Sequence, residues 1–91
     1  MKKLSPKEIK EELDGIEGWE YDGESIFKFF NFTTFTDAIK FVDKIAQIAE
    51  EIQHHPSILI DYTRIRLSIC THEINGVSDK DIDFAARVNF I

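Results

Sequence analysis

All three histidines of this 91-residue chain fall in one stretch of its sequence. His54 and His55 stand side by side in "EEIQHHP", and His72 follows in "CTHE". Imidazole titrates near neutral pH, so it can both deliver and accept a proton under physiological conditions. The clustering therefore predicts a site for general acid–base chemistry. Chance is the alternative interpretation, because three histidines are an ordinary number for a chain of this length.

Carboxylates accompany these histidines. Glu50 and Glu51 each precede one of the paired histidines by four residues, a spacing at which side chains on a helix meet. We therefore expect them to support the pair by holding its imidazoles. Asp81 follows Ser78 by three residues, where the free N–H groups of a starting helix favour an ionised carboxylate. Its simplest role is to complete a capping box, and that role is compatible with a place in the histidine site.

The histidine pair is expected at the end of a long helix. Pro56 lacks a backbone N–H and biases His55 away from the helical conformation, so a helix that starts near Thr34 should stop near His54. Adjacent helical residues point about 100° apart, so at least one of the two histidines should be exposed. Apolar residues at three- and four-residue spacings predict the buried face: Phe35, Ile39, Val42, Ala46, Ala49 and Ile52.

His72 is expected at the end of a hairpin. Apolar and polar residues alternate over residues 57–70, which predicts two strands around a turn at Thr63 and Arg64. In that register Asp61 opposes Arg66, and His72 falls on the polar face. The residues expected on the apolar face are Ile58, Ile60, Tyr62, Ile65, Leu67 and Ile69.

The rest of the chain completes an α+β fold. Ser5 and Glu8 predict a capping box for a first helix that ends near Gly15, and residues 18–32 predict a hairpin around an Asp-Gly turn. Ser78 is expected to cap a last helix. The order αββαββα implies one domain over residues 1–91, in which the helices pack on one face of a four-stranded antiparallel sheet.

Composition limits the partners. The net charge of −6, with scattered Lys and Arg, argues against nucleic acid and anionic membranes. The single Cys70 excludes a disulfide framework and fits a reduced, cytoplasmic setting. The chain shows neither an apolar leader nor a run of the roughly 18 apolar residues that a membrane span needs.

The second predicted strand favours self-association. Phe27 and Phe29 alternate with Phe30 and Phe32, so aromatic side chains fall on both faces of the strand. A small chain is not expected to leave such a surface in water, which predicts a homodimer or a homotetramer.

A set of motifs resembles the pterin-4a-carbinolamine dehydratase family. The set comprises "EEIQHHP", then Tyr62, then "THE" with His72, then "SDKDI" with Asp81. The resemblance extends upstream through "GW" at Gly18 and Trp19 and through "IFKFFNF", so it covers nearly the whole chain. It implies the same αββαββα fold.

The resemblance also implies an activity. Family members dehydrate 4a-hydroxytetrahydropterins to quinonoid dihydropterins, without a metal or an organic cofactor, so the chain is expected to be a hydro-lyase, a 4a-hydroxytetrahydrobiopterin dehydratase. His54 and His72 would transfer protons, with Asp81 orienting a histidine or contacting the substrate, and His55 would hold the pterin. The other residues expected to bind substrate are Tyr62, Thr71 and Glu73.

Two alternatives remain open. Animal relatives also serve as dimerisation partners of a homeodomain transcription factor, so the chain could be a non-catalytic protein-binding module. Three histidines with an aspartate could also bind zinc, although a dehydration of this kind needs no Lewis acid. The last helix looks short beside those animal relatives, which makes a dimer a serious alternative to a tetramer.

Overall fold

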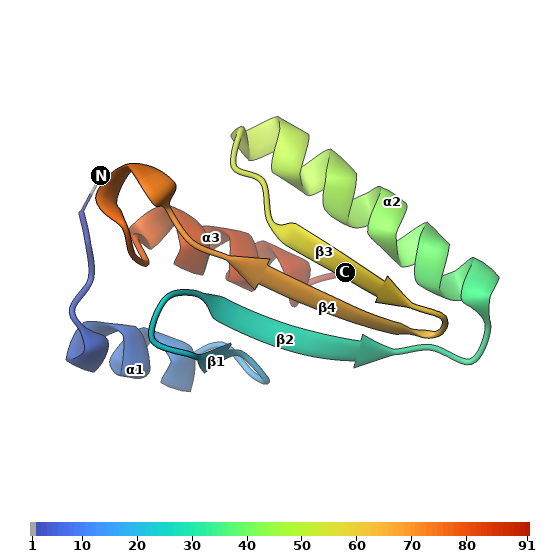
Figure 1. Cartoon of the computed structure of the whole chain (residues 1–91), viewed down its shortest axis with the longest axis horizontal. Coiled ribbons are helices and arrows are strands. Elements are labelled where there is room, and N and C mark those ends of the chain that lie inside the picture. Colours follow the sequence, from blue (N-terminus) through green and yellow to red (C-terminus); the bar gives the residue numbers. More distant parts are fainter. Residues whose placement is uncertain (1) are drawn as a thin grey trace.

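The elements follow one another in the predicted αββαββα order in a computed structural model that describes residues 2–91 (Figure 1). Met1, part of the predicted domain, lies outside these residues. A short 3-10 helix, η1, is the one addition to that order within the described part of the chain. The elements are α1 (Pro6–Asp14), β1 (Glu20–Tyr21), β2 (Ile26–Asn31), α2 (Phe35–Ile52), β3 (Ser57–Asp61), β4 (Arg64–Ile69), η1 (His72–Ile74) and α3 (Asp79–Val88).

The four strands form one antiparallel sheet in the order β1-β2-β4-β3. One face of this sheet packs on the helices, and the core between them contains Ile65 and Leu67 from β4, Ile45 from α2 and Phe84 from α3. The opposite face carries no helix (Figure 1). The expected α+β architecture, with helices on one side, is therefore confirmed.

Local capping motifs set the helix boundaries as predicted. The Ser5 hydroxyl accepts the backbone N–H of Glu8, whose carboxylate accepts the backbone N–H of Ser5, and α1 ends at a Gly15 cap. Ser78 and Asp81 form the same reciprocal box at α3. Each box satisfies backbone donors that the first turn of a helix leaves free.

The buried face of α2 differs from the predicted stripe. Its buried residues are Ala38, Phe41, Ile45 and Ala49, of which Ala49 belongs to the predicted stripe. The predicted Phe35 is 48% exposed, Ala46 is also exposed, and Ile39, Val42 and Ile52 are partly buried. Both sets have helical spacing, because α2 carries two adjacent apolar stripes. Contact with the sheet decides which stripe is buried, and the periodicity of one segment does not carry that information.

The register of the β3–β4 hairpin is also corrected. The turn lies at Tyr62 and Thr63, one residue earlier than predicted, so Asp61 pairs with Arg64 and Leu59 opposes Arg66. The predicted opposition of Asp61 and Arg66 is therefore wrong. Tyr62 adopts a φ of 52°, a left-handed conformation that is uncommon for a residue other than glycine. Its residue type gives no indication of that turn.

Candidate active site

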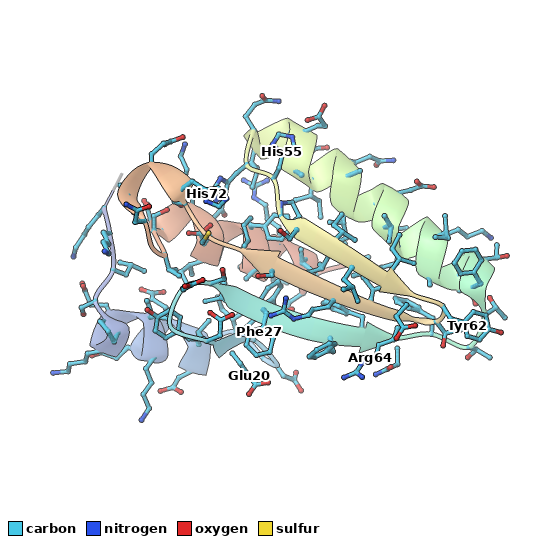
Figure 2. All side chains as sticks on the ribbon, in the orientation of Figure 1. Glu20, Phe27, His55, Tyr62, Arg64 and His72 are labelled. Carbon is cyan, nitrogen blue, oxygen red and sulfur yellow. The ribbon has the colours of Figure 1, made fainter. Side chains whose placement is uncertain are left out.

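Three segments that are distant in the sequence meet at one end of the molecule. They are the residues after α2, the loop between β4 and α3 that contains η1, and the first turn of α3. Figure 2 shows His55 and His72 at this end, whereas Tyr62 lies at the opposite end. The segments that carry the three histidines therefore lie at the same end of the molecule.

The end of α2 directs His54 toward α3. Gln53 takes a left-handed conformation (φ 52°) that ends the helix, and the backbone N–H of His54 returns to the carbonyl of Ala49 at 3.0 Å. The ring of His54 then reaches the first turn of α3, where its Nε2 lies 2.5 Å from Oδ1 of Asp81. Only 14% of the His54 side chain is exposed, compared with none of Asp81.

The Asp81 carboxylate is held from several sides. Its Oδ2 accepts the backbone N–H of Ser78 at 2.8 Å and the hydroxyl of Thr71 at 2.9 Å. The hydroxyls of Thr71 and Ser78 lie 2.7 Å apart, so the three buried side chains form one network. A buried carboxylate needs this many donors to remain favourable away from water. Asp81 thus serves both as the predicted cap residue and as the partner of His54.

This arrangement determines which nitrogen of His54 is available. When Nε2–H donates to Asp81, the lone pair of the neutral ring resides on Nδ1. That nitrogen has no hydrogen-bond partner among residues 2–91. A carboxylate behind an imidazole fixes its tautomer and stabilises the imidazolium that forms when the ring takes up a proton. In this tautomer the Nδ1 atom of His54 can accept a proton.

His72 lies on a small closed loop. The backbone groups of Thr71 and Gly76 bond reciprocally, at 2.8 and 3.3 Å, and enclose η1 between them. His72 is exposed there, and its Nδ1 lies 3.9 Å from Sγ of Cys70. With Cys70, Gly76, Glu24 and Asn75, His72 lines a cavity of about 290 Å³. Neither His54 nor His55 lines this cavity.

The paired glutamates do not act as their spacing predicted. Oε2 of Glu50 lies 2.5 Å from Nε2 of His55, five residues on, rather than beside His54. The reason is that α2 ends at Ile52, so the helical spacing of four residues does not extend to the histidines. Glu51 is exposed and has no hydrogen bond to a histidine within residues 2–91.

The other residues expected to bind substrate fall into different environments. Tyr62 is 70% exposed and stacks on Phe35 at the far turn of the hairpin, with a ring separation of 6.3 Å. Within one chain it lies apart from the histidines (Figure 2). Thr71 is buried and bonds to Asp81, so it positions the carboxylate. Glu73 is exposed on η1, next to His72.

Two neighbours of the site were not among the predicted site residues. The Ser78 hydroxyl was expected only as a helix cap, but it also bonds to Thr71 beneath Asp81. Cys70 was considered only for disulfides and metals, but its thiol lies beside His72. The alternation of β4 placed Cys70 and His72 on the same side, which was the available signal for that contact.

Two general properties of the described chain bear on the alternatives. Among residues 2–91, no group of three or more His, Cys, Asp and Glu side chains is arranged to hold a metal ion. None of the helices described here has the length and apolar character needed to cross a membrane.

Comparisons with a family model and with individual proteins point to the same family. Residues 2–91 match the family described as pterin 4 alpha carbinolamine dehydratase. A protein of Sulfolobus acidocaldarius, provisionally named a pterin-4-alpha-carbinolamine dehydratase, is 42% identical over 89 residues, which are 98% of each chain. A protein of Gloeobacter violaceus with the same provisional name is 44% identical over 92 residues, covering 97% of this chain and 100% of its own.

Solved structures agree with this result. The crystal structure of a transcriptional coactivator/pterin dehydratase from Brucella melitensis superposes with a TM-score of 0.91 at 35% identity, covering 98% of this chain and 97% of that one. A pterin dehydratase-like protein described as a RuBisCO assembly factor in the alpha-carboxysome superposes with a TM-score of 0.69 at 26% identity, covering 81% and 88%. The chain belongs to the pterin 4 alpha carbinolamine dehydratase family.

Proposed function

We propose that this protein dehydrates a 4a-hydroxytetrahydropterin to the quinonoid dihydropterin by histidine acid–base catalysis. The observation that carries the proposal is the buried Asp81 carboxylate held against Nε2 of His54. The capping bonds use Oδ2 of Asp81, whereas Oδ1 is directed at His54, where its charge would stabilise an imidazolium. Family membership supplies the class of substrate, a pterin.

The reaction requires two proton transfers. The bond between C4a and the hydroxyl oxygen breaks, and the oxygen leaves as water once it has received a proton. A proton lost from a ring nitrogen then leaves the neutral quinonoid product. In the proposed mechanism His54 accepts the ring proton at Nδ1, and Asp81 stabilises the resulting imidazolium. His72, which lines a cavity of about 290 Å³, delivers the proton to the leaving hydroxyl.

Proton transfer alone completes this chemistry, so the proposed reaction uses neither a metal nor an organic cofactor. His55 is assigned to pterin binding, with Glu50 holding its ring at the surface. Glu73 is assigned to the same task because it lies on η1 beside His72.

We also propose a reduced, cytoplasmic setting, which the unpaired thiol of Cys70 suits.

A homo-oligomer is part of the proposal. The second apolar stripe of α2 leaves Phe35 48% exposed, with Ile39 and Val42 only partly covered. Ile60, on the neighbouring edge strand β3, is 45% exposed. Exposed apolar side chains on α2 and on the edge strand β3 favour a second copy of the chain as their cover.

A non-catalytic protein-binding role is the second candidate. The names of the two solved relatives, a transcriptional coactivator/pterin dehydratase and a RuBisCO assembly factor, support it. Against it, a pure adaptor would not need the His54–Asp81 pair or an exposed His72 on a closed loop.

A turnover assay separates the two candidates. The purified protein would be mixed with a freshly generated 4a-hydroxytetrahydropterin, and the decay of its absorbance would be compared with decay in buffer. We expect acceleration that is lost in a His54→Ala, His72→Ala double variant that still folds. Decay no faster than in buffer would remove the dehydratase proposal and leave the binding role.

A further inference from the structure

We propose that the outer edge of β2 is a docking site for an extended acidic segment of another protein, which adds to the sheet as a further strand. The site is separate from the histidines and does not depend on the dehydratase activity. Three features of the structure lead to it: an unpaired strand edge, an adjoining groove, and cations on both sides of that edge.

The edge is free because β1 is very short. β1 pairs only with the first two residues of β2, Ile26 and Phe27. Farther along, the backbone N–H of Phe32 donates to the carbonyl of Thr63, on the β4 side. Bonding directions alternate along an antiparallel pair, so Phe29 and Asn31 direct their N–H and C=O groups outward. No group within residues 2–91 bonds to the backbone of Phe29 or Asn31 on that outer side.

A groove follows this edge on the helix side of the sheet. It has a volume of about 760 Å³ and runs between β2, the first half of α2 and the residues that end α3. Its floor is aromatic, because the Phe41 ring lies 4.7 Å from that of Phe30 and 5.1 Å from that of Phe32. The groove can therefore receive the aliphatic part of a side chain from a strand laid along β2.

Cations flank the edge on both faces of the sheet. On the helix side, Lys40 and Lys44 stand exposed one turn apart on α2 at the groove, where Asp37 is the opposing charge. On the open face, the guanidinium of Arg64 lies 4.1 Å from the centre of the Phe29 ring, and that of Arg66 lies 5.9 Å from it. Figure 2 labels Arg64 and Phe27 along this border of the sheet.

These positive charges lie together on a chain whose net charge is −6. Some are already engaged, since Arg66 lies 3.8 Å from Asp22 and the Lys28 ammonium donates to the Glu17 carbonyl and to Asn89. Lys40, Lys44 and Arg64 have no ion pair within residues 2–91, although Asp61 is the cross-strand partner of Arg64. Successive side chains of an added strand point to opposite faces of the sheet. A carboxylate would therefore meet a cation whichever face it points to.

Symmetry argues for a different protein rather than a second copy at this edge. Two copies joined through β2 about a twofold axis would bring like residues near one another across that axis. Lys40, Lys44 and Arg64 would then face an equally basic partner edge. An acidic segment from another chain meets no such repulsion and supplies the missing counter-charges.

The test uses a fluorescein-labelled octapeptide in which Glu and Val alternate, with binding followed by fluorescence anisotropy at low salt. We expect saturable binding that weakens as salt rises, because exposed ion pairs are screened. A Lys40→Glu, Lys44→Glu variant should bind about tenfold more weakly, since two exposed attractions become repulsions. A Lys7→Glu, Lys10→Glu variant makes the same charge change on the exposed side of α1 and should bind as the unaltered protein does.

Two further measurements test strand addition itself. N-methylation of every second amide of the peptide removes its pairing donors and should abolish binding, although its charge is unchanged. Asn31→Pro removes an outward N–H at an edge position where proline is tolerated, and it should weaken binding while circular dichroism stays unchanged. Pterin turnover should be the same in the Lys40→Glu, Lys44→Glu variant as in the unaltered protein. Failure of the docking proposal can therefore be distinguished from failure of the dehydratase proposal.

Several outcomes would overturn the inference. Equal weakening in the two charge variants would show unspecific attraction, and undiminished binding of the methylated peptide would rule out strand pairing. If the peptide did not bind even at low salt, the proposed docking site would be refuted. Conversion of an oligomer to a monomer by Asn31→Pro would assign the edge to a second copy instead.

Discussion

At the scale of single residues, the proposed chemistry depends on which nitrogen of each histidine is free to exchange a proton. Asp81 holds Nε2 of His54, so Nδ1 of that ring is the available base. The ring of His72 lies 3.9 Å from the thiol of Cys70, and His55 is paired with the exposed Glu50. The three rings therefore have three different environments, and their substitution should have different kinetic effects.

The first prediction concerns these kinetic differences. His54→Ala and His72→Ala should each lower kcat by about 10² to 10⁴, the usual contribution of a general acid or base. His55→Ala should mainly raise KM, because a group that binds the ground state and the transition state equally does not change kcat. Steady-state assays on a 4a-hydroxytetrahydropterin would measure the split. Unchanged kcat and KM in all three folded variants would contradict the catalytic assignment.

The second prediction concerns Asp81. Asp81→Asn keeps the size of the side chain but removes the negative charge behind His54, so kcat should fall while KM changes little. The buried amide also leaves a polar group poorly paired, at a cost of about 1–3 kcal/mol in the free energy of unfolding. Thr71→Ser keeps the hydroxyl that bonds to Asp81 and is the matched control. An Asp81→Asn variant with undiminished kcat would show that this carboxylate is only a helix cap.

At the scale of elements, capping motifs decide where the site lies, because α3 must be capped by Ser78 for Asp81 to face His54. The third prediction compares two caps. Ser78→Ala should cost toward the upper end of the roughly 0.5–2 kcal/mol typical of a lost cap, since the Ser78 hydroxyl is buried and also bonds to Thr71. Ser5→Ala removes an exposed cap and should cost less. Urea unfolding measures both, and equal costs would show that the buried network adds nothing.

The fourth prediction concerns pH and α1. The ammonium of Lys2 and the backbone N–H of Ser5 hold the pKa of Glu8 at about 2, below its ordinary 4.5. A lowered folded pKa gives stability that is present above the unfolded value and is lost as pH falls toward the folded one. Relative to the unaltered protein, Glu8→Gln should therefore lose stability above pH 4.5, and the difference should shrink toward pH 2. Urea midpoints across that range measure it, and a pH-independent difference would contradict the pairing.

The elements also show what the sequence could predict. The capping boxes at Ser5 and Ser78 use residues three apart, so local chemistry was enough to locate α1 and α3. The turn of the second hairpin was misplaced because Tyr62 adopts a left-handed conformation that its residue type does not favour. The prediction that Glu50 contacts His54 was wrong because it assumed helical spacing, whereas α2 ends at Ile52, before the histidines.

At the scale of the whole molecule, the site exists only once distant segments have met. His54 and Asp81 are 27 positions apart, and the Thr71 hydroxyl joins them from the end of β4. Chain periodicity gave the elements but not these contacts, so the resemblance of the motifs, rather than spacing, brought Asp81 and the histidines into one predicted site. The burial of the Thr71–Ser78–Asp81 network depends on how α3 packs and had no signal in the sequence.

The last prediction concerns assembly through α2. The stripe of Phe35, Ile39, Val42 and Ala46 is partly exposed on α2, and Ile60 is exposed on the edge strand β3. Covering these side chains with a second copy removes apolar surface from water. We expect light scattering at micromolar concentration to give a multiple of 10.6 kDa. Ala46→Glu introduces a charge within the stripe, at an exposed position where glutamate has good helix propensity, so it should yield a folded monomer.

The matched control for this substitution is Gln47→Glu. It adds the same charge at the next exposed position of α2, about 100° around the helix from Ala46 and outside the stripe, so it should leave the oligomer intact. Dissociation by both variants would indicate a general effect of negative charge on α2 rather than contact through the stripe. A protein that is monomeric before any substitution would refute the assembly.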